Sequence, residues 1–192
     1  MPNHIINILK FKNLTQTQVW DIVNRITNIN PDDPLGTGTT IDFDKIIPEP
    51  RTKEECPEDC LITPDSHVSI DDERPWFDWY AWRTKYWDTK WNAYSAYTKI
   101  NKSSVQFVFN TAWSAPAAIY SQLVKMFPDV IMEVEWADED YSSGNCGKAI
   151  YDPERTGVTD LWVIDRDEMP NLRRFARDLW TRYWTRYWKG EM

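Results

Sequence analysis

The chain has 192 residues, of which 42% are hydrophobic and 27% charged, a composition typical of a soluble globular domain rather than of a disordered or fibrous protein. No apolar run approaches the ~20 residues that a membrane-spanning helix needs, so we expect no membrane contact. The net charge of −8 argues against direct binding of nucleic acid, because phosphate recognition needs clustered Lys and Arg. The N-terminal residues lack the charged and apolar regions of a signal peptide, and the three cysteines cannot all pair, which together predict a cytoplasmic location.

The first predicted elements are a strand and a helix. Apolar positions alternate in residues 3–11 around Ile6 and Ile8, as in a buried strand. A helix is predicted over about residues 15–28, because apolar residues recur there at spacings of three and four: Val19, Ile22, Val23 and Ile26.

Residues 31–75 differ in composition from the rest of the chain. They contain seven of the twelve prolines, and 13 acidic residues against 4 basic ones. Since proline disfavours helix interiors and central strands, we predict mostly loop, with "TIDFDKIIP" as a short edge strand. A helix is then predicted to begin at Arg74-Pro75, with Asp71, Asp72 and Glu73 at its positive end. Its aromatic face would hold Trp76, Trp79, Tyr80, Arg83 and Trp87.

The stretch "YWDTKWNAYSAY" at residues 86–97 begins a predicted β-hairpin. Alternating residues follow Asp88-Thr89, and a polar turn at 101–103 leads into "SVQFVFNTAW". Aromatic stripes at regular spacing are more often core than a binding surface, which remains the alternative. We therefore expect Trp91 and Trp113 to be buried, each contributing roughly 3–5 kcal/mol against truncation to alanine. Lys90 is expected to form a salt bridge with Asp88 or Asp138, with a role as a contact residue as the alternative.

The remaining pattern completes a recognisable topology. Ser114 and Pro116 begin a helix with the stripe Ile119, Leu123 and Phe127, and "DVIMEVEW" alternates as a strand with one apolar face. The resulting order, β-α-(insertion)-β-β-α-β, is that of a ferredoxin-like sandwich. We therefore predict a single α+β domain over 1–192, in which helices cover one face of an antiparallel sheet made by 1–12, 90–100, 104–113 and 129–137. Its additions are the acidic Pro-rich insertion 31–75 and a C-terminal helix at 170–188.

Five segments occur together in an order and spacing that resemble one protein family: "MPNHIIN", "WDTKWNAY", "FNTAWSAP", "FPDV" and "ADEDYSSGNCG". They are similar to phage- and plasmid-encoded proteins with a YubB-type ferredoxin-like domain, over roughly residues 1–150. The resemblance implies a ferredoxin-like fold and an origin in a mobile element, and it implies no catalytic residue. Related sequences usually have Gly where this chain has Asp88. A position that needs a positive φ would accept Asp at some cost relative to Gly.

Two groups of side chains are candidate metal sites. Cys56 and Cys60 have only His67 as a third nearby ligand, whereas a structural zinc site needs four. The acids Asp138, Glu139 and Asp140 lack the ligand alternation of a calcium loop, so a charged turn with Gly144 and Asn145 at its bend is favoured. We predict no metal, no cofactor and no catalytic residue, because the sequence also lacks a nucleotide-binding Gly-rich loop, HExxH and GxSxG.

The C-terminal "LWTRYWTRYW" has a period of four, which on a helix produces a slanted ridge of Trp180, Trp184 and Trp188. The simpler interpretation is a terminal helix that packs this ridge on the sheet and leaves its arginines in solvent. Trp, Tyr and Arg are also the residues that dominate protein–protein hot spots, so the helix is a candidate contact surface.

Two functional hypotheses follow. The first is a non-catalytic mobile-element protein that binds a protein of the bacterial host and inhibits a defence system such as CRISPR. The second is a metal-dependent or nucleic-acid-processing accessory enzyme that uses the acids of 138–140, which would then have to converge with other acids in a cleft. For the first hypothesis, the predicted contact residues are Asp138, Glu139, Asp140, Arg177, Arg182, Arg186 and Trp188.

Overall fold

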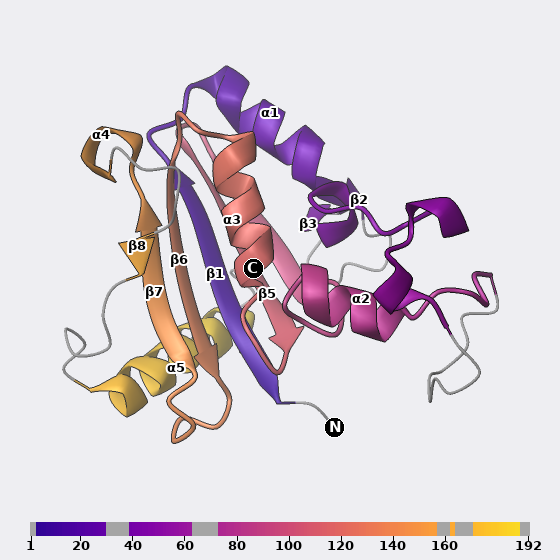
Figure 1. The fold of residues 1–192 in the computed structure, drawn as a ribbon. Coiled ribbons are helices and arrows are strands. Elements are labelled where there is room, and N and C mark those ends of the chain that lie inside the picture. Colours follow the sequence, from indigo (N-terminus) through magenta and orange to yellow (C-terminus); the bar gives the residue numbers. More distant parts are fainter. Residues whose placement is uncertain (1–2, 30–38, 63–72, 157–161, 164–170, 189–192) are drawn as a thin grey trace.

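A computed structural model describes residues 3–29, 39–62, 73–156, 162–163 and 171–188. Within these ranges the central feature is a six-stranded sheet of order β4-β5-β1-β6-β7-β8 in which every neighbouring pair is antiparallel (Figure 1). Its strands are β1 (His4–Lys12), β4 (Tyr94–Asn101), β5 (Ser104–Ala112), β6 (Ile131–Asp138), β7 (Cys146–Tyr151) and β8 (Trp162–Val163). The prediction that residues 1–12, 90–100, 104–113 and 129–137 contribute to one antiparallel sheet is confirmed.

Two amphipathic helices cover one face of the sheet. α1 (Gln16–Ile26) begins with a capping box between Thr15 and Gln18 and buries the four apolar residues that its spacing predicted. α3 (Ala117–Met126) follows Pro116 and buries Ile119 and Leu123. Together with the inward side chains of the strands, these helices form the larger hydrophobic core. The α+β ferredoxin-like fold is therefore confirmed.

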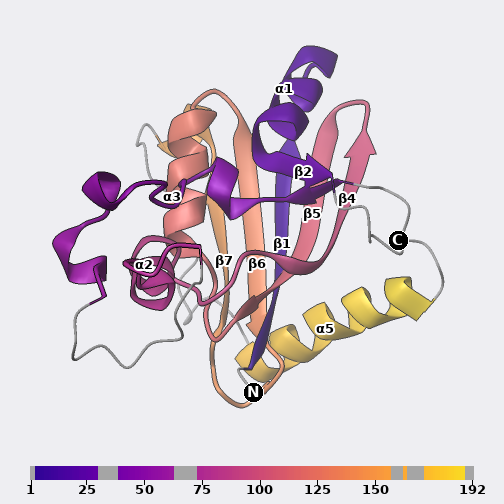
Figure 2. The same cartoon turned by 90° about the vertical axis from the view of Figure 1, so that its right-hand side faces the viewer.

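The C-terminal helix α5 (Leu172–Trp188) packs on the opposite face of the sheet. In Figure 2 it extends to the lower right of the strands, while α2 and α3 lie to the left. Trp180 and Tyr183 are buried in a second, smaller core with Ile6 and Val108. The Trp180 indole Nε1–H donates to the carbonyl oxygens of Ala137 and Asp138 at 3.1 and 2.9 Å. The expected packing of the ridge on the sheet is thus confirmed for Trp180, whereas the side chains of Trp184 and Trp188 lie outside the described residues.

The described part of the insertion is folded against the main core. β2 (Thr27–Ile29) and β3 (Thr39–Ile41) form a two-stranded sheet of their own, and three single 3₁₀ turns follow at Phe43–Lys45, Lys53–Glu55 and Glu58–Cys60. Phe43, Ile46 and Cys60 are buried in the larger core. The segment is mostly irregular, as its prolines predicted, and its apolar residues are nevertheless part of the domain.

The aromatic helix begins later than its sequence predicts. α2 spans Trp79–Tyr86, and its N-cap is Asp78, whose carboxylate accepts from Ala81 N–H at 2.9 Å. The preceding residues are held by the insertion instead: Ile62 N–H donates to Trp76 O at 2.9 Å, and Asp78 N–H donates to Cys60 O at 2.9 Å. These tertiary hydrogen bonds override the helix-start signal of Arg74-Pro75. A short helix α4 (Pro153–Thr156) follows β7.

A buried polar network joins α3 to the centre of the sheet. Asn7 is fully buried, and its amide donates to Ile5 O and to Thr111 Oγ1, both at 2.9 Å. The Tyr120 hydroxyl donates to Asn7 Oδ1 at 2.8 Å. Burial raises the pKa of Tyr120 well above its usual value, so this hydroxyl stays protonated and serves as a permanent donor.

Replacing Tyr120 with phenylalanine is expected to lower the free energy of unfolding by about 1–3 kcal/mol, because Asn7 Oδ1 would be left buried without its donor. Urea denaturation followed by tryptophan fluorescence measures this change. Tyr80→Phe is the matched control, since the Tyr80 ring is 38% exposed and should lose almost nothing. Equal stability of Tyr120→Phe and the wild-type chain would mean that the network contributes no net stability.

Candidate functional site

The two most specific sequence motifs meet at one end of the sheet. Because the strands are antiparallel, β1, β4 and β7 begin where β5 and β6 end, at the bottom of Figure 1 near the N-terminus. Thr89 of "WDTKWNAY" donates its hydroxyl to Ala112 O at 2.9 Å and accepts from Ala112 N–H at 3.1 Å. The "FNTAWSAP" segment is therefore fastened directly to the turn that precedes β4.

Asp88 adopts a left-handed conformation in this turn, with φ of 59°. A positive φ favours Gly, which is the residue that related sequences usually have at this position. The Asp88 carboxylate accepts from Ala118 N–H at 2.8 Å, in the first turn of α3, so the side chain adds an interaction that Gly could not make. Ser114 Oγ donates to Asp88 O and closes the turn on the other side.

Four side chains at this end form what we call the aromatic–lysine cluster: Tyr80, Lys90, Trp91 and Trp113. Lys90 Nζ lies 5.7, 5.0 and 5.1 Å from the ring centroids of Tyr80, Trp91 and Trp113. Tyr80 and Trp113 also contact each other edge to face at 6.1 Å. The expected salt bridge of Lys90 with Asp88 or Asp138 is wrong, because the ammonium lies among three aromatic rings instead.

The prediction that Trp113 is a core residue is also wrong. β5 ends at Ala112, and Trp113 takes φ of 71°, which turns its ring out of the alternation so that 43% of the residue is exposed. The conformation is held from both sides, because Trp113 N–H donates to Asn3 O and Asn145 Nδ2 donates to Trp113 O, each at 3.0 Å. A left-handed backbone costs a tryptophan roughly 1–2 kcal/mol, so the surrounding contacts must impose it.

The other aromatic residues of the motif divide between core and surface. Trp87 is only 1% exposed and belongs to the larger core. The prediction that Trp91 is buried in the core is wrong as well, because the residue is only partly buried and contacts Tyr94 edge to face at 5.9 Å. Trp91 thus lies at the border of the aromatic–lysine cluster, and the rings exposed most there are those of Tyr80 and Trp113.

The acidic loop after β6 separates into buried and exposed carboxylates. Asp138 is 5% exposed and accepts from Asn3 Nδ2 at 3.2 Å and from Asp140 N–H at 2.9 Å, so it is a structural residue. Glu139 and Asp140 are exposed. Glu139 accepts from His4 N–H at 2.9 Å, and hydrogen bonds from Ser142 hold the pKa of Asp140 below its usual value. The three acids therefore serve separate local contacts and do not converge in a cleft.

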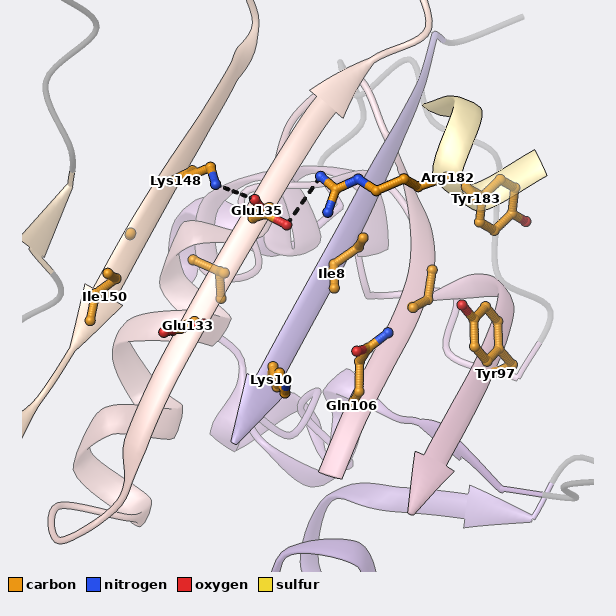
Figure 3. Close-up of a pocket in the computed structure, with 13 residues that line it drawn as sticks. Ile8, Lys10, Tyr97, Gln106, Glu133, Glu135, Lys148, Ile150, Arg182 and Tyr183 are labelled. Atoms are coloured by element: carbon orange, nitrogen blue, oxygen red, sulfur yellow. Dashed lines mark hydrogen bonds and ion pairs between the residues drawn. The ribbon is translucent and has the colours of Figure 1, made fainter. Parts of the chain in front are cut away.

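Of the arginines predicted as contact residues, Arg177 and Arg182 lie on α5, the helix that packs across the other face of the sheet. Arg177 is exposed beside Asp178 at 3.7 Å. Arg182 projects into a groove of about 400 Å³ on the sheet, where it pairs with Glu135 at 3.3 Å while Lys148 pairs with the same carboxylate at 2.5 Å (Figure 3). The side chain of Arg186, like that of Trp188, lies outside the described residues. Among the described side chains, Arg177 and Arg182 thus pair with Asp178 and Glu135 rather than with the predicted acids 138–140.

The cysteine pair of the insertion is part of the core. Cys56 and Cys60 are both buried. Burial, with a smaller effect of Asp59, raises the pKa of both thiols, that of Cys60 to about 11, so they remain protonated at neutral pH. No group of three potential metal-ligating side chains occurs among the described residues. His67, the third ligand considered from the sequence, lies outside them.

A second feature of the sheet end was not predicted from the sequence. His4 Nδ1 and the Tyr94 hydroxyl lie 2.6 Å apart, and the Tyr94 hydroxyl also donates to Thr111 O at 3.2 Å. Burial first, and then the charge of Glu139, raises the pKa of Tyr94 to about 12. His4, Tyr94 and Glu139 line a pocket of about 290 Å³ between the sheet and α5. Since His4, Tyr94 and Glu139 are far apart in sequence, no local sequence motif predicts the pocket.

Residues 86–176 match a family model described as the ferredoxin-like domain in Api92-like protein. This similarity supports a ferredoxin-like domain. The match includes Lys90, Trp91, Trp113 and the acidic loop, whereas His4 and Tyr80 precede it. Comparison with curated proteins gives no match, and comparison with solved structures gives none either. None of the helices in the described ranges has the length and apolarity to cross a bilayer.

Proposed function

We propose that this chain is a non-catalytic protein that binds a protein of a bacterial host through the aromatic–lysine cluster. We further propose that a mobile element encodes this chain and that the chain inhibits a defence system such as CRISPR. The resemblance of its motifs to phage- and plasmid-encoded proteins motivates this second proposal. The proposal of a binding surface rests on the exposed Trp113, which is held in a left-handed conformation, contacts Tyr80 edge to face and has the Lys90 ammonium over its ring.

Residue type and rigidity both support a binding surface. Tryptophan and tyrosine are enriched in binding hot spots, because a large ring buries much area at a small cost in side-chain entropy. Trp113 and Tyr80 are 43% and 38% exposed, so part of each ring remains available to a partner. The backbone of Trp113 is fixed by Asn3 and Asn145, which reduces the ordering cost of association.

Charge around the cluster favours a basic partner. Glu139 and Asp140 are exposed in the adjoining loop, and the whole chain has a net charge of −8. Exposed acids beside an aromatic anchor raise the association rate with a positively charged surface and add little to affinity. Asp138 is buried, so we no longer expect it to contact a partner directly.

Affinity capture from a bacterial host lysate, compared between variants by quantitative mass spectrometry, tests this proposal. The double variant Tyr80→Ala/Trp113→Ala should lose most of the protein that the wild-type chain enriches, since truncation of a hot-spot ring costs about 2 kcal/mol or more. Trp20→Ala is the matched control, because Trp20 is 50% exposed on α1 and lies outside the cluster.

Only a protein retained by the control and lost by the double variant supports the proposal. Enrichment that is unchanged in the double variant would place the contact elsewhere on the molecule. Circular dichroism melting of all three proteins ensures that the comparison concerns folded chains.

A further inference from the structure

The pocket between the sheet and α5 contains a buried polar atom without a partner. Asn110 is 7% exposed, and its Oδ1 makes no hydrogen bond within the described structure. Asn110 lines the pocket together with His4, Tyr94, Ser95, Glu139, Trp180 and Tyr183. Buried amide oxygens are nearly always paired, so an unpaired one in a pocket wall indicates a missing donor.

The cross-strand register arranges these residues. Asn110 of β5 lies between Ile6 of β1 and Tyr94 of β4. His4 lies two residues before Ile6 on β1, and its carbonyl accepts from Glu139 N–H at 2.9 Å. Since Ile6 pairs with Asn110 and two strand residues span roughly 7 Å, Glu139 lies about that far from Asn110 along the strands. Asn110 therefore forms the inner wall of the pocket, and the exposed Glu139 lies at its mouth.

A bulge in β4 adds acceptors to this wall. The pairing with β5 shifts register between Tyr94 and Tyr97, and Ser95 takes φ of 47°. The Tyr183 hydroxyl donates to Ser95 O over a long 3.5 Å, and a carbonyl oxygen has two lone pairs, so Ser95 O can accept from a ligand as well. A non-Gly residue with a positive φ at a strand bulge is a strained feature, and such features concentrate at binding sites.

We propose that this pocket binds a guanidinium group. Glu139 supplies a carboxylate, and Asn110 and Ser95 supply carbonyl oxygens, whereas no Lys or Arg is among the described residues that line it. The aromatic rings of Tyr94, Trp180 and Tyr183 complete the walls. Acceptors on two sides and aromatic surface between them match a flat cation with donors along all its edges.

The planar shape favours guanidinium over ammonium. An ammonium is a compact, strongly hydrated charge, whereas a guanidinium stacks on aromatic rings and sheds water more easily. Its donors on opposite edges can reach Glu139 at the mouth and Asn110 on the inner wall together. The amide torsion of asparagine is soft, so a small rotation presents Asn110 Oδ1 to the ligand.

NMR titration of the full chain, followed at the Trp180 indole N–H, tests this inference. The probe is N-acetyl-arginine methylamide, and its matched control is the citrulline counterpart, which has nearly the same shape without the charge. We expect a saturable shift with the arginine probe and none with citrulline. Glu139→Gln should weaken binding about tenfold or more through loss of the charge-assisted bond. Asp140→Asn, an exposed acid of the same loop outside the pocket lining, should change it less than about twofold.

Asn110→Ala provides a second variant, and it should also weaken binding while the remaining spectrum stays that of the folded chain. The guanidinium source is distinguished by comparing agmatine with a blocked arginine-containing pentapeptide. Tighter binding of agmatine indicates a free small molecule, and tighter binding of the peptide indicates an arginine of a protein. The inference is overturned if no guanidinium probe gives a saturable shift at millimolar concentration, if citrulline binds equally, or if Glu139→Gln behaves like Asp140→Asn.

Discussion

Replacing Trp87 with alanine is expected to lower the free energy of unfolding by about 3–5 kcal/mol. The ring is 1% exposed and contacts Phe43 and Trp82 edge to face at centroid distances of 5.8 and 5.5 Å. Its indole N–H donates to Ile47 O at 2.8 Å, so truncation also removes the donor of a carbonyl in the insertion. Trp87 thus joins α2, the insertion and the sheet in one core.

Urea denaturation monitored by circular dichroism measures this loss. Trp20→Ala is again the matched control, because the same chemical truncation at a residue that is 50% exposed should stay within about 0.5 kcal/mol of the wild-type value. Similar losses in both variants would contradict the assignment of Trp87 to the core.

Glu49→Gln is expected to lower the free energy of unfolding by about 3 kcal/mol, the lower end of the range for breaking a buried ion pair. Glu49 is 5% exposed and binds two arginines: Arg74 Nη2 at 2.8 Å, and Arg83 through its Nε. The side chains of Arg74 and Arg83 are 19% and 24% exposed, so without the carboxylate their charges keep only part of their hydration. Because of this residual hydration, we expect the loss of unfolding free energy to lie at the lower end of the range for buried ion pairs.

The same denaturation experiment with Glu54→Gln provides the control, since Glu54 is an exposed acid of the same insertion. We expect it to be close to neutral, as for most surface substitutions. If Glu49→Gln proved as stable as Glu54→Gln, the three-residue ion network would not be what fastens the insertion to α2.

The periodic parts of the fold could be predicted from the sequence. The alternation in β1, β5 and β6 and the three–four spacing in α1 and α3 indicate the faces that form the larger core, and these patterns alone lead to the ferredoxin-like order. Burial of one face is a local property of each element, so it is visible in a single sequence. The face of the sheet on which α5 packs depends on the whole topology and could not be obtained in this way.

The predictions for Trp113 and Lys90, both at the end of the sheet, were wrong for a common physical reason. Trp113 continues the alternation of β5, and only a left-handed backbone held by Asn3 and Asn145 turns its ring outward. Lys90 has acids nearby in sequence, yet the fold brings it among aromatic rings instead. In both cases contacts between distant segments decide the outcome, and periodicity carries no information about them.

The candidate site was only partly predictable for the same reason. The aromatic pattern around "YWDTKWNAYSAY" favoured core, and it could not separate the buried Trp87 from the exposed Trp113. The pocket beside His4 and Asn110 comes from β1, β4, β5 and α5 together. A bulge and an unpaired amide are features of the tertiary structure, which no spacing of residues in the sequence expresses.

Calorimetric titration of the purified partner from the capture experiment into the wild-type chain, Trp113→Ala and Trp20→Ala tests the proposed binding surface most directly. We predict that Trp113→Ala raises the dissociation constant by about 30-fold, corresponding to about 2 kcal/mol, and that Trp20→Ala leaves it unchanged. Equal dissociation constants for all three proteins would contradict the proposal that the aromatic–lysine cluster is the contact surface.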